Sequence, residues 1–311
     1  MCSDEKKNGA VCGVCFRHCR IEEGGLGFCG ARTCSGGKIV CASYGKATSL
    51  ALDPIEKKPL RRFHPGSLIL SVGSYGCNLR CPFCQNNEIS WSDEAMRMAR
   101  HAAGTDKGAG PEYISPEELA ATAEYYVDRG NIGVAFTYNE PLIGYEYVRD
   151  AAKLVHEKSM KNVMVTNGTA ELSVLSELSP YIDAMNIDLK SFTDRFYSSV
   201  LGGDRKMVMD FIAEAVKVCH VELTTLIIPG ENDSEEEMDE LSSWIASLDA
   251  APEYYDSKAP EGSAGSLIPL HVTRFFPCFH MTDRGPTDVD LVKRLAAVAG
   301  KNLKYVYTGN I

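Results

Sequence analysis

The sequence lacks the features that would direct it to a membrane, to secretion or to nucleic acid. No apolar run approaches the ~20 residues that a transmembrane helix needs. The amino terminus is polar and has no apolar segment like that of a secretory signal. Acidic residues outnumber basic ones by 42 to 32, so no excess of positive charge is available for a phosphate backbone. We therefore expect a cytoplasmic protein that binds neither membrane nor nucleic acid.

Cysteine, in contrast, is abundant. The chain has 12 cysteines, of which seven lie between Cys2 and Cys41 and three between Cys77 and Cys84. In a chain without a secretory signal, clustered cysteines favour metal ligands over a disulfide framework. Metal chemistry is therefore expected in the first third of the chain.

The remainder of the chain alternates between strand-like and helix-like segments, without an internal repeat. Strand-like runs cover residues 68–72, 133–137, 163–166, 184–189, 221–228, 268–273 and 304–307. Helix-like runs cover residues 142–158, 171–178, 206–218, 234–248 and 287–299. This alternation predicts a parallel sheet with right-handed crossovers. Six or seven units fall short of the eight in a closed barrel, so we expect the α/β class with a partial, TIM-like (β/α)6 barrel.

Three local features complete the predicted organisation. Residues 1–66 are rich in Cys and Gly, which indicates an irregular amino-terminal extension stapled by metal or disulfides, with residues 67–311 forming the barrel domain. Residues 91–112 have the composition of a long loop. Ser115 and Glu118 can form a capping box that starts a helix running to about Arg129.

Cys77, Cys81 and Cys84, the motif cysteines, follow the first predicted strand with C-x-x-x-C-x-x-C spacing. Three thiolates on one loop can hold a 4Fe–4S cluster, which normally takes four cysteines. One iron then keeps open positions, and an amino and a carboxylate group of one small molecule can fill them. The methionyl end of S-adenosylmethionine supplies that pair. The alternatives are a zinc site or three unrelated core cysteines.

The motif resembles that of the radical S-adenosylmethionine superfamily, in which an aromatic residue precedes the last cysteine. Phe83 stands there in this chain, and the resemblance places it near the cofactor. The likeness extends to enzymes related to the pyruvate formate-lyase activating enzyme, and in particular to AmmeMemoRadiSam-system proteins. The similar stretches are residues 53–60, 63–67, 137–141, 186–190, 225–233 and 306–310. Family members often continue into a short cysteine-bearing tail, whereas this sequence ends at Ile311, so we expect no metal ligand from such a tail.

The resemblance implies an activity. In this family a reduced cluster cleaves S-adenosylmethionine to methionine and a 5′-deoxyadenosyl radical, which abstracts a hydrogen atom. It implies a flavodoxin- or ferredoxin-like electron donor and a protein substrate such as a glycyl radical enzyme. Two alternatives stay open at this point. The radical could act on another protein side chain or a small molecule, or the chain could be a non-catalytic iron–sulfur electron carrier or metal-binding protein.

Ligands of parallel α/β folds bind at the carboxyl ends of the strands. The polar residues expected there are Asn139, Glu140, Thr166, Asn167, Asp188 and Lys190. By resemblance, Glu140 accepts hydrogen bonds from the methionyl ammonium group, although Tyr138-Asn139 stands where the family has glycines. Thr166 and Asn167 can reach the ribose or the methionyl carboxylate.

Three further groups of residues are candidates. Asp188 and Lys190 face the same side of a strand, where they can bind the cofactor, form an internal ion pair, or do both. His271 and Arg274 lie on or after the sixth predicted strand, where the activating enzymes place a cofactor contact. Lys57, Lys58, Arg61 and Arg62 form a basic run that is either a solvated loop or a docking site for the electron donor.

The amino-terminal extension offers a second set of ligands, which we call the amino-terminal cysteines: Cys12, Cys15, Cys19 and Cys29. Four thiolates suit zinc or an iron–sulfur cluster. Spacing alone does not choose between structural zinc, an auxiliary cluster, and free thiols or disulfides.

Overall fold

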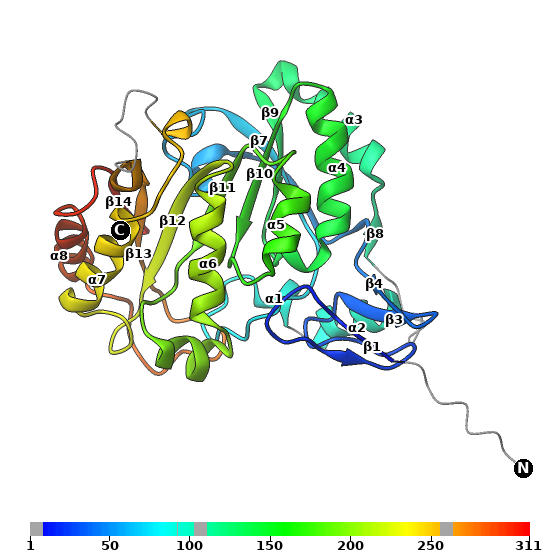
Figure 1. Ribbon diagram of the computed structural model, residues 1–311, viewed down its shortest axis with the longest axis horizontal. Helices are drawn as coiled ribbons and strands as arrows, with labels where there is room; N and C mark the ends of the chain where they lie inside the picture. Colours follow the sequence, from blue (N-terminus) through cyan, green and yellow to red (C-terminus); the bar gives the residue numbers. More distant parts are fainter. Residues whose placement is uncertain (1–8, 92, 103–110, 256–263) are drawn as a thin grey trace, which may run out of the picture.

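The computed structural model describes residues 9–91, 93–102, 111–255 and 264–311. Its centre is an eight-stranded sheet in the order β14-β13-β12-β11-β10-β9-β7-β6 (Figure 1). These strands are β6 (Ser49–Pro54), β7 (Leu68–Gly73), β9 (Asn131–Phe136), β10 (Lys161–Thr166), β11 (Ala184–Asp188), β12 (His220–Ile227), β13 (Leu270–Arg274) and β14 (Val306–Gly309). The strands from β7 to β14 are parallel, and β6 pairs with β7 in the antiparallel sense. The sheet does not close, because β6 and β14 are its two edges, and the predicted α/β partial barrel is confirmed.

Helices connect the parallel strands, and those between β9 and β12 lie along one face of the sheet in Figure 1. The longer helices are α3 (Pro116–Tyr125), α4 (Tyr145–Glu157), α5 (Leu172–Leu178), α6 (Arg205–Ala215), α7 (Glu235–Ala246) and α8 (Val289–Ala299). Short helical turns are α1 (Asn87–Ser90), η1 (Ile55–Lys57), η2 (Val127–Arg129), η3 (Pro141–Gly144), η4 (Phe196–Leu201), η5 (Pro252–Tyr254) and η6 (Ala264–Leu267). The predicted capping box is present, since the Ser115 side chain accepts from Glu118 N and the Glu118 carboxylate accepts from Ser115 N. Among the described residues, no helix is both long and apolar enough to cross a membrane.

The amino-terminal segment contains several short strands. They are β1 (Ala10–Val11), β2 (Arg20–Ile21), β3 (Arg32–Ser35), β4 (Lys38–Cys41) and β5 (Lys46–Ala47), the last of which pairs with β8 (Glu112–Tyr113). In Figure 1 the first strands lie beside α1 at one end of the large sheet. The segment is therefore packed close to the loop that carries the motif cysteines.

The prediction of a long loop for residues 91–112 is wrong over much of this range. Residues Asp93–Ala102 form helix α2, while residues 103–110 lie outside the described part of the chain. The helix buries Ala95 and Ala99, and a side chain at Gly30 would contact Met96 and Ala99. A small-residue face that packs on a distant glycine thus stabilises a helix that local composition does not indicate.

Candidate active site at the carboxyl ends of the strands

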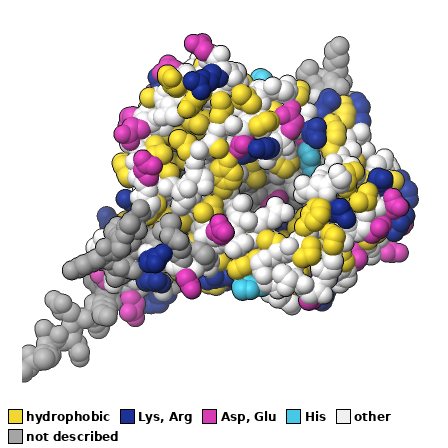
Figure 2. All heavy atoms as spheres, turned by 180° about the vertical axis from the view of Figure 1, so that it is seen from behind, with side chains coloured by type: hydrophobic (Ala, Val, Ile, Leu, Met, Phe, Trp, Pro, Cys, Tyr) yellow, Lys and Arg dark blue, Asp and Glu magenta, His cyan; other side chains and the backbone are white. Residues whose placement is uncertain are grey.

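A cavity of about 290 Å³ opens where the parallel strands end. Figure 2 shows the molecule hollowed on the face opposite to that of Figure 1. Most of the residues predicted for the site line this cavity: Cys77, Cys81, Phe83, Cys84, Asn139, Glu140, Thr166, Asn167, Asp188 and Lys190. Residues from four different segments of the chain thus meet in one place, as the strand order requires.

The motif cysteines come from the loop after β7, and none forms a disulfide. Burial raises the pKa of Cys81 to about 11, although Lys190 acts in the opposite direction. The thiols therefore hold protons until a metal replaces them. Three thiols from one loop on the wall of the same cavity suit a 4Fe–4S cluster, in which each thiolate binds a different iron.

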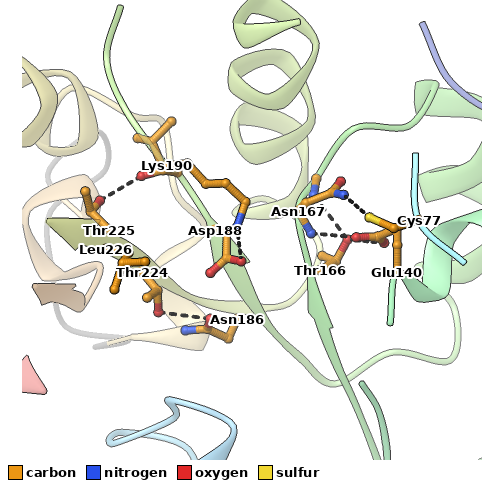
Figure 3. Close-up of polar contacts among 12 residues, drawn as sticks. Cys77, Glu140, Thr166, Asn167, Asn186, Asp188, Lys190, Thr224, Thr225 and Leu226 are labelled. Carbon is orange, nitrogen blue, oxygen red and sulfur yellow. Dashed lines mark hydrogen bonds and ion pairs between the residues drawn. The ribbon is translucent and has the colours of Figure 1, made fainter. Parts of the chain in front are cut away.

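Glu140 follows β9 and is buried beneath the cavity. Its carboxylate accepts hydrogen bonds from Thr166 Oγ1 at 2.6 Å, Asn167 N at 2.8 Å and Leu142 N at 3.0 Å (Figure 3). Burial raises the pKa of Glu140 to about 7, even though these donors favour the charged form. A buried carboxylate held by three donors still has room for a fourth, and a cationic donor would offset the cost of its burial.

Of the two residues that stand in place of the family's glycines, Tyr138 adopts a glycine-like backbone. Tyr138 has a left-handed φ of 74°, which is uncommon for a residue with a side chain. Its hydroxyl donates to Asp53 Oδ2 at 2.7 Å, and Lys58 Nζ, itself 2.9 Å from Asp53, lies over the Tyr138 ring. Asn139 Oδ1 accepts from Ser74 N at 2.9 Å. These contacts offset the backbone strain and hold Glu140 in position.

Asp188 and Lys190 form an ion pair of 2.7 Å on the cavity wall (Figure 3). Burial alone would lower the pKa of Lys190, but Asp188 and Cys81 raise it above its ordinary value. Lys190 is thus a permanent cation beside the motif cysteines. The internal ion pair is present, and both side chains also line the cavity, so the pair and a contact with the cofactor are compatible.

Asn78 is a site residue that the sequence reasoning missed. It is buried, and its Oδ1 accepts a hydrogen bond from Asn167 Nδ2 at 2.9 Å. The same Asn167 nitrogen lies 3.6 Å from Cys77 Sγ, at the reach of an N–H···S bond. The signal in the sequence was an amide directly after the first motif cysteine. Thr224, Thr273 and Asn310 also line the cavity without having been predicted.

His271 and Arg274 are not among the residues that line the cavity. His271 lies lower in β13 and contacts the carboxylate of Glu222 at 2.7 Å. Arg274 alternates to the other side of the strand from Thr273, and its Nε donates to Thr287 O at 2.7 Å. Of the side chains near the end of β13, Thr273 therefore lines the cavity. His271 faces the same side but lies two residues earlier in the strand, and Arg274 faces the other side.

The basic run does not lie together on the surface. Lys58 is buried against Asp53, whereas Lys57 is exposed and pairs with the same carboxylate at 3.1 Å. The backbone N–H groups of Arg61 and Arg62 donate to Glu222. This loop anchors the interior of the half-barrel, so a docking role rests on its exposed members alone. The amino-terminal cysteines line a separate, smaller cavity.

Comparisons with known proteins agree with this geometry. A family model described as the Radical SAM superfamily matches residues 71–242. An uncharacterized protein of Methanocaldococcus jannaschii is 36% identical over 306 residues, which are 98% of this chain and 82% of that protein. The pyruvate formate-lyase-activating enzyme of Clostridium pasteurianum is 26% identical over 56% of this chain and 67% of its own. The structure of Streptococcus suis SuiB bound to S-adenosylmethionine shares the fold, with a TM-score of 0.54 at 14% identity over 77% of this chain and 51% of that chain. The chain belongs to the radical SAM superfamily.

Proposed function

We propose that this radical SAM enzyme activates a protein substrate by taking a hydrogen atom from it, in the manner of the enzymes that activate glycyl radical proteins. The family uses a 4Fe–4S cluster and S-adenosylmethionine. When bound, the reduced cluster and S-adenosylmethionine supply a 5′-deoxyadenosyl radical that abstracts the hydrogen atom. The carrying observation is that three unbridged thiols, a buried carboxylate and a buried cation meet on one open cavity.

The residues present suit both groups. The motif cysteines would hold three irons and leave the fourth for S-adenosylmethionine. Glu140 has one acceptor position left, which suits the methionyl ammonium group and gives a charge-assisted hydrogen bond. Lys190 suits a carboxylate, and the Thr224 hydroxyl on the far wall suits a ribose.

A protein substrate is supported by the open edge of the sheet. β14 and β6 do not pair, and the cavity is lined both by Asn310, just after β14, and by Pro59 and Asn86 near the other edge. A loop of a partner protein could therefore reach the cavity through the gap. The relative from Clostridium pasteurianum, whose name is that of an activating enzyme, supports the same substrate class.

The test starts with anaerobic reconstitution of the cluster, reduction by dithionite and addition of S-adenosylmethionine. We expect 5′-deoxyadenosine and methionine in equal amounts. A fully loaded cluster that forms neither product would overturn the proposal. Addition of a glycyl radical protein labelled with deuterium at glycine should then transfer deuterium into 5′-deoxyadenosine.

A second outcome distinguishes the alternative substrate class. If 5′-deoxyadenosine forms but label enters only from other residues, or only from a small molecule in a cell extract, the radical chemistry stands and the glycine target is excluded. The cavity walls contain threonine hydroxyls and asparagine amides that would bind polar small molecules equally well. A small-molecule substrate is therefore the second candidate.

A further inference from the structure

The amino-terminal cysteines meet around one space. All four line one small cavity, together with apolar side chains and two arginines, and none forms a disulfide. The hydrogen bond from Cys12 N to Cys19 O, 2.9 Å long, closes the loop that carries three of them. Cys29 reaches the same cavity from the segment after β2. Three cysteines on one loop and a fourth from farther along the chain are thus gathered without a covalent link.

The two cysteine groups share a pattern of hydrogen bonds to sulfur. Cys15 accepts from the backbone N–H of Arg17, and Cys29 accepts from that of Ala31. Among the motif cysteines, Cys77 and Cys84 accept in the same way from the residues two positions later. Backbone N–H groups aimed at sulfur stabilise a thiolate and tune an iron–sulfur cluster. The amino-terminal cysteines therefore have the local geometry of ligands and not that of ordinary core thiols.

Arg32 provides an independent sign of a missing ligand. It lines this cavity with only 4% of its surface exposed. Its Nη1 is 2.6 Å from Glu146, but its buried Nε has no hydrogen-bond partner among the described residues. Buried donors are almost always satisfied, so an acceptor is expected. Arg17 adds a second positive charge to the same wall, which suits an anionic group.

The nature of the group follows from the unpaired donor on the cavity wall. Four thiolates can hold either zinc or a 4Fe–4S cluster. The unpartnered Arg32 Nε favours the cluster, because a cubane adds sulfide acceptors that a zinc ion does not have. With four cysteines, such a cluster has no open iron and cannot bind S-adenosylmethionine.

The two cysteine groups are also connected through the residues that flank Cys77. Asn78 donates to the Cys15 thiol, Asn167 Nδ2 donates to Asn78, and the same nitrogen lies 3.6 Å from Cys77 Sγ. On the other side of Cys77, a side chain at Gly76 would collide with the carbonyl oxygen of Cys29. Both neighbours of the first motif cysteine therefore pack against the amino-terminal cysteine segment.

We propose that Cys12, Cys15, Cys19 and Cys29 hold a second 4Fe–4S cluster that passes single electrons to the cluster at the motif cysteines. An electron-transfer protein of low potential gives one electron to the second cluster, which is reoxidised when the first cluster is reduced. No bond is made or broken in this relay. The site stands on its own geometry, while its role as a relay rests on the proposed function.

The site can be tested without activity. A Cys77→Ala/Cys81→Ala/Cys84→Ala protein, reconstituted without oxygen, should keep about four irons and four sulfides per chain, against about eight in the wild type. After reduction it should give an electron paramagnetic resonance signal that S-adenosylmethionine does not alter. A Cys34→Ala/Cys41→Ala protein, whose substitutions lie outside the cavity, should keep all of its iron. Zinc in place of iron in the triple variant, or no metal at all, would overturn the proposal.

The relay has its own readout. A Cys12→Ala/Cys15→Ala protein should retain the motif cluster, and with excess dithionite it should still form 5′-deoxyadenosine. With a reduced flavodoxin as the donor, 5′-deoxyadenosine should fall to the background level. Equal rates with flavodoxin in the variant and the wild type would rule out the relay. Loss of product with both reductants in the wild type would instead count against the proposed function, so the two failures are distinguishable.

Discussion

The motif cysteines and the amino-terminal cysteines are neighbours with similar local geometry but different surroundings. The first group has three thiols on the wall of a cavity of about 290 Å³, with the Asp188–Lys190 ion pair beside them. The second group has four thiols around a much smaller cavity whose other walls are largely apolar or arginine. The number of thiols and the free space thus change together. Where the protein leaves one position open, it also leaves room and an ion pair for a substrate, and where it supplies all four thiols it leaves little free space.

The largest expected effect comes from removing one thiol of the open group. A Cys84→Ala protein should form no 5′-deoxyadenosine above background, because two thiolates do not hold a cluster at this loop. Product analysis by chromatography measures this loss. Cys219→Ala is the matched control, since Cys219 is buried at the start of β12, outside both groups, and its loss should leave cleavage unchanged. Normal cleavage by the Cys84→Ala protein would remove the distinction between the two groups.

A region without cysteine shows which effects concern folding alone. Glu222 is fully buried and accepts from Arg61 N, Arg62 N, His220 and His271. Although burial acts in the opposite direction, the two histidines and the loop N–H hold the pKa of Glu222 at about 2. Glu222→Gln should lower the free energy of unfolding by about 3 kcal/mol, because it breaks a buried charged network. Iron content and S-adenosylmethionine binding should not change.

The pH dependence of this effect follows from the lowered pKa. The stabilisation is complete above the ordinary glutamate pKa of about 4.3 and is lost as the pH falls towards about 2. The difference between wild type and variant should therefore shrink over that interval. Urea titrations of metal-free protein, followed by tryptophan fluorescence, measure it, since acid dissolves iron–sulfur clusters. A difference that stays constant down to pH ~2 would contradict the assignment of the charge to Glu222.

Glu140→Gln tests whether the remaining acceptor position of this carboxylate binds the methionyl ammonium group. A charge-assisted hydrogen bond contributes about 2 kcal/mol, so the variant should bind S-adenosylmethionine about 30-fold more weakly. Calorimetric titration of the reconstituted protein gives the constant, and iron analysis should show both cysteine groups loaded. An unchanged affinity would place the ammonium group elsewhere in the cavity.

Much of the fold was predictable because each strand is a short apolar run followed by glycine or polar residues. The seven parallel strands lie close to their predicted bounds, and the Ser115–Glu118 capping box occurs as expected. Strand β6 and helix α2 were not predicted, because both depend on partners distant in the sequence. β6 becomes a strand by pairing with β7, and α2 is a helix that packs Ala99 near Gly30.

The site was predictable where a strand end places it and unpredictable where tertiary contacts do. Glu140, Asn167 and Lys190 line the cavity because parallel strands end at one edge. The role of Asn78 could not be read from the sequence, since it depends on a hydrogen bond from a residue 89 positions away. His271 belongs to the Glu222 network because it lies two residues before Thr273 in β13, farther from the cavity at the carboxyl end of the strand.

The smallest expected effect tests whether the two cysteine groups are joined. Asn78→Ala removes the donor to Cys15 and frees Asn167, which otherwise bridges Asn78 and Cys77. A hydrogen bond of about 1 kcal/mol corresponds to about 40 mV for a one-electron couple. Because hydrogen bonds to sulfur favour the reduced, more negative cluster, both midpoint potentials should become more negative by about this amount. Redox titration followed by paramagnetic resonance measures them, with Asn302→Ala, on the far side of the sheet beside Asp239, as the control. A shift confined to one cluster would mean that Asn78 serves that group alone, and the two sites would then be neighbours without a shared hydrogen-bond path.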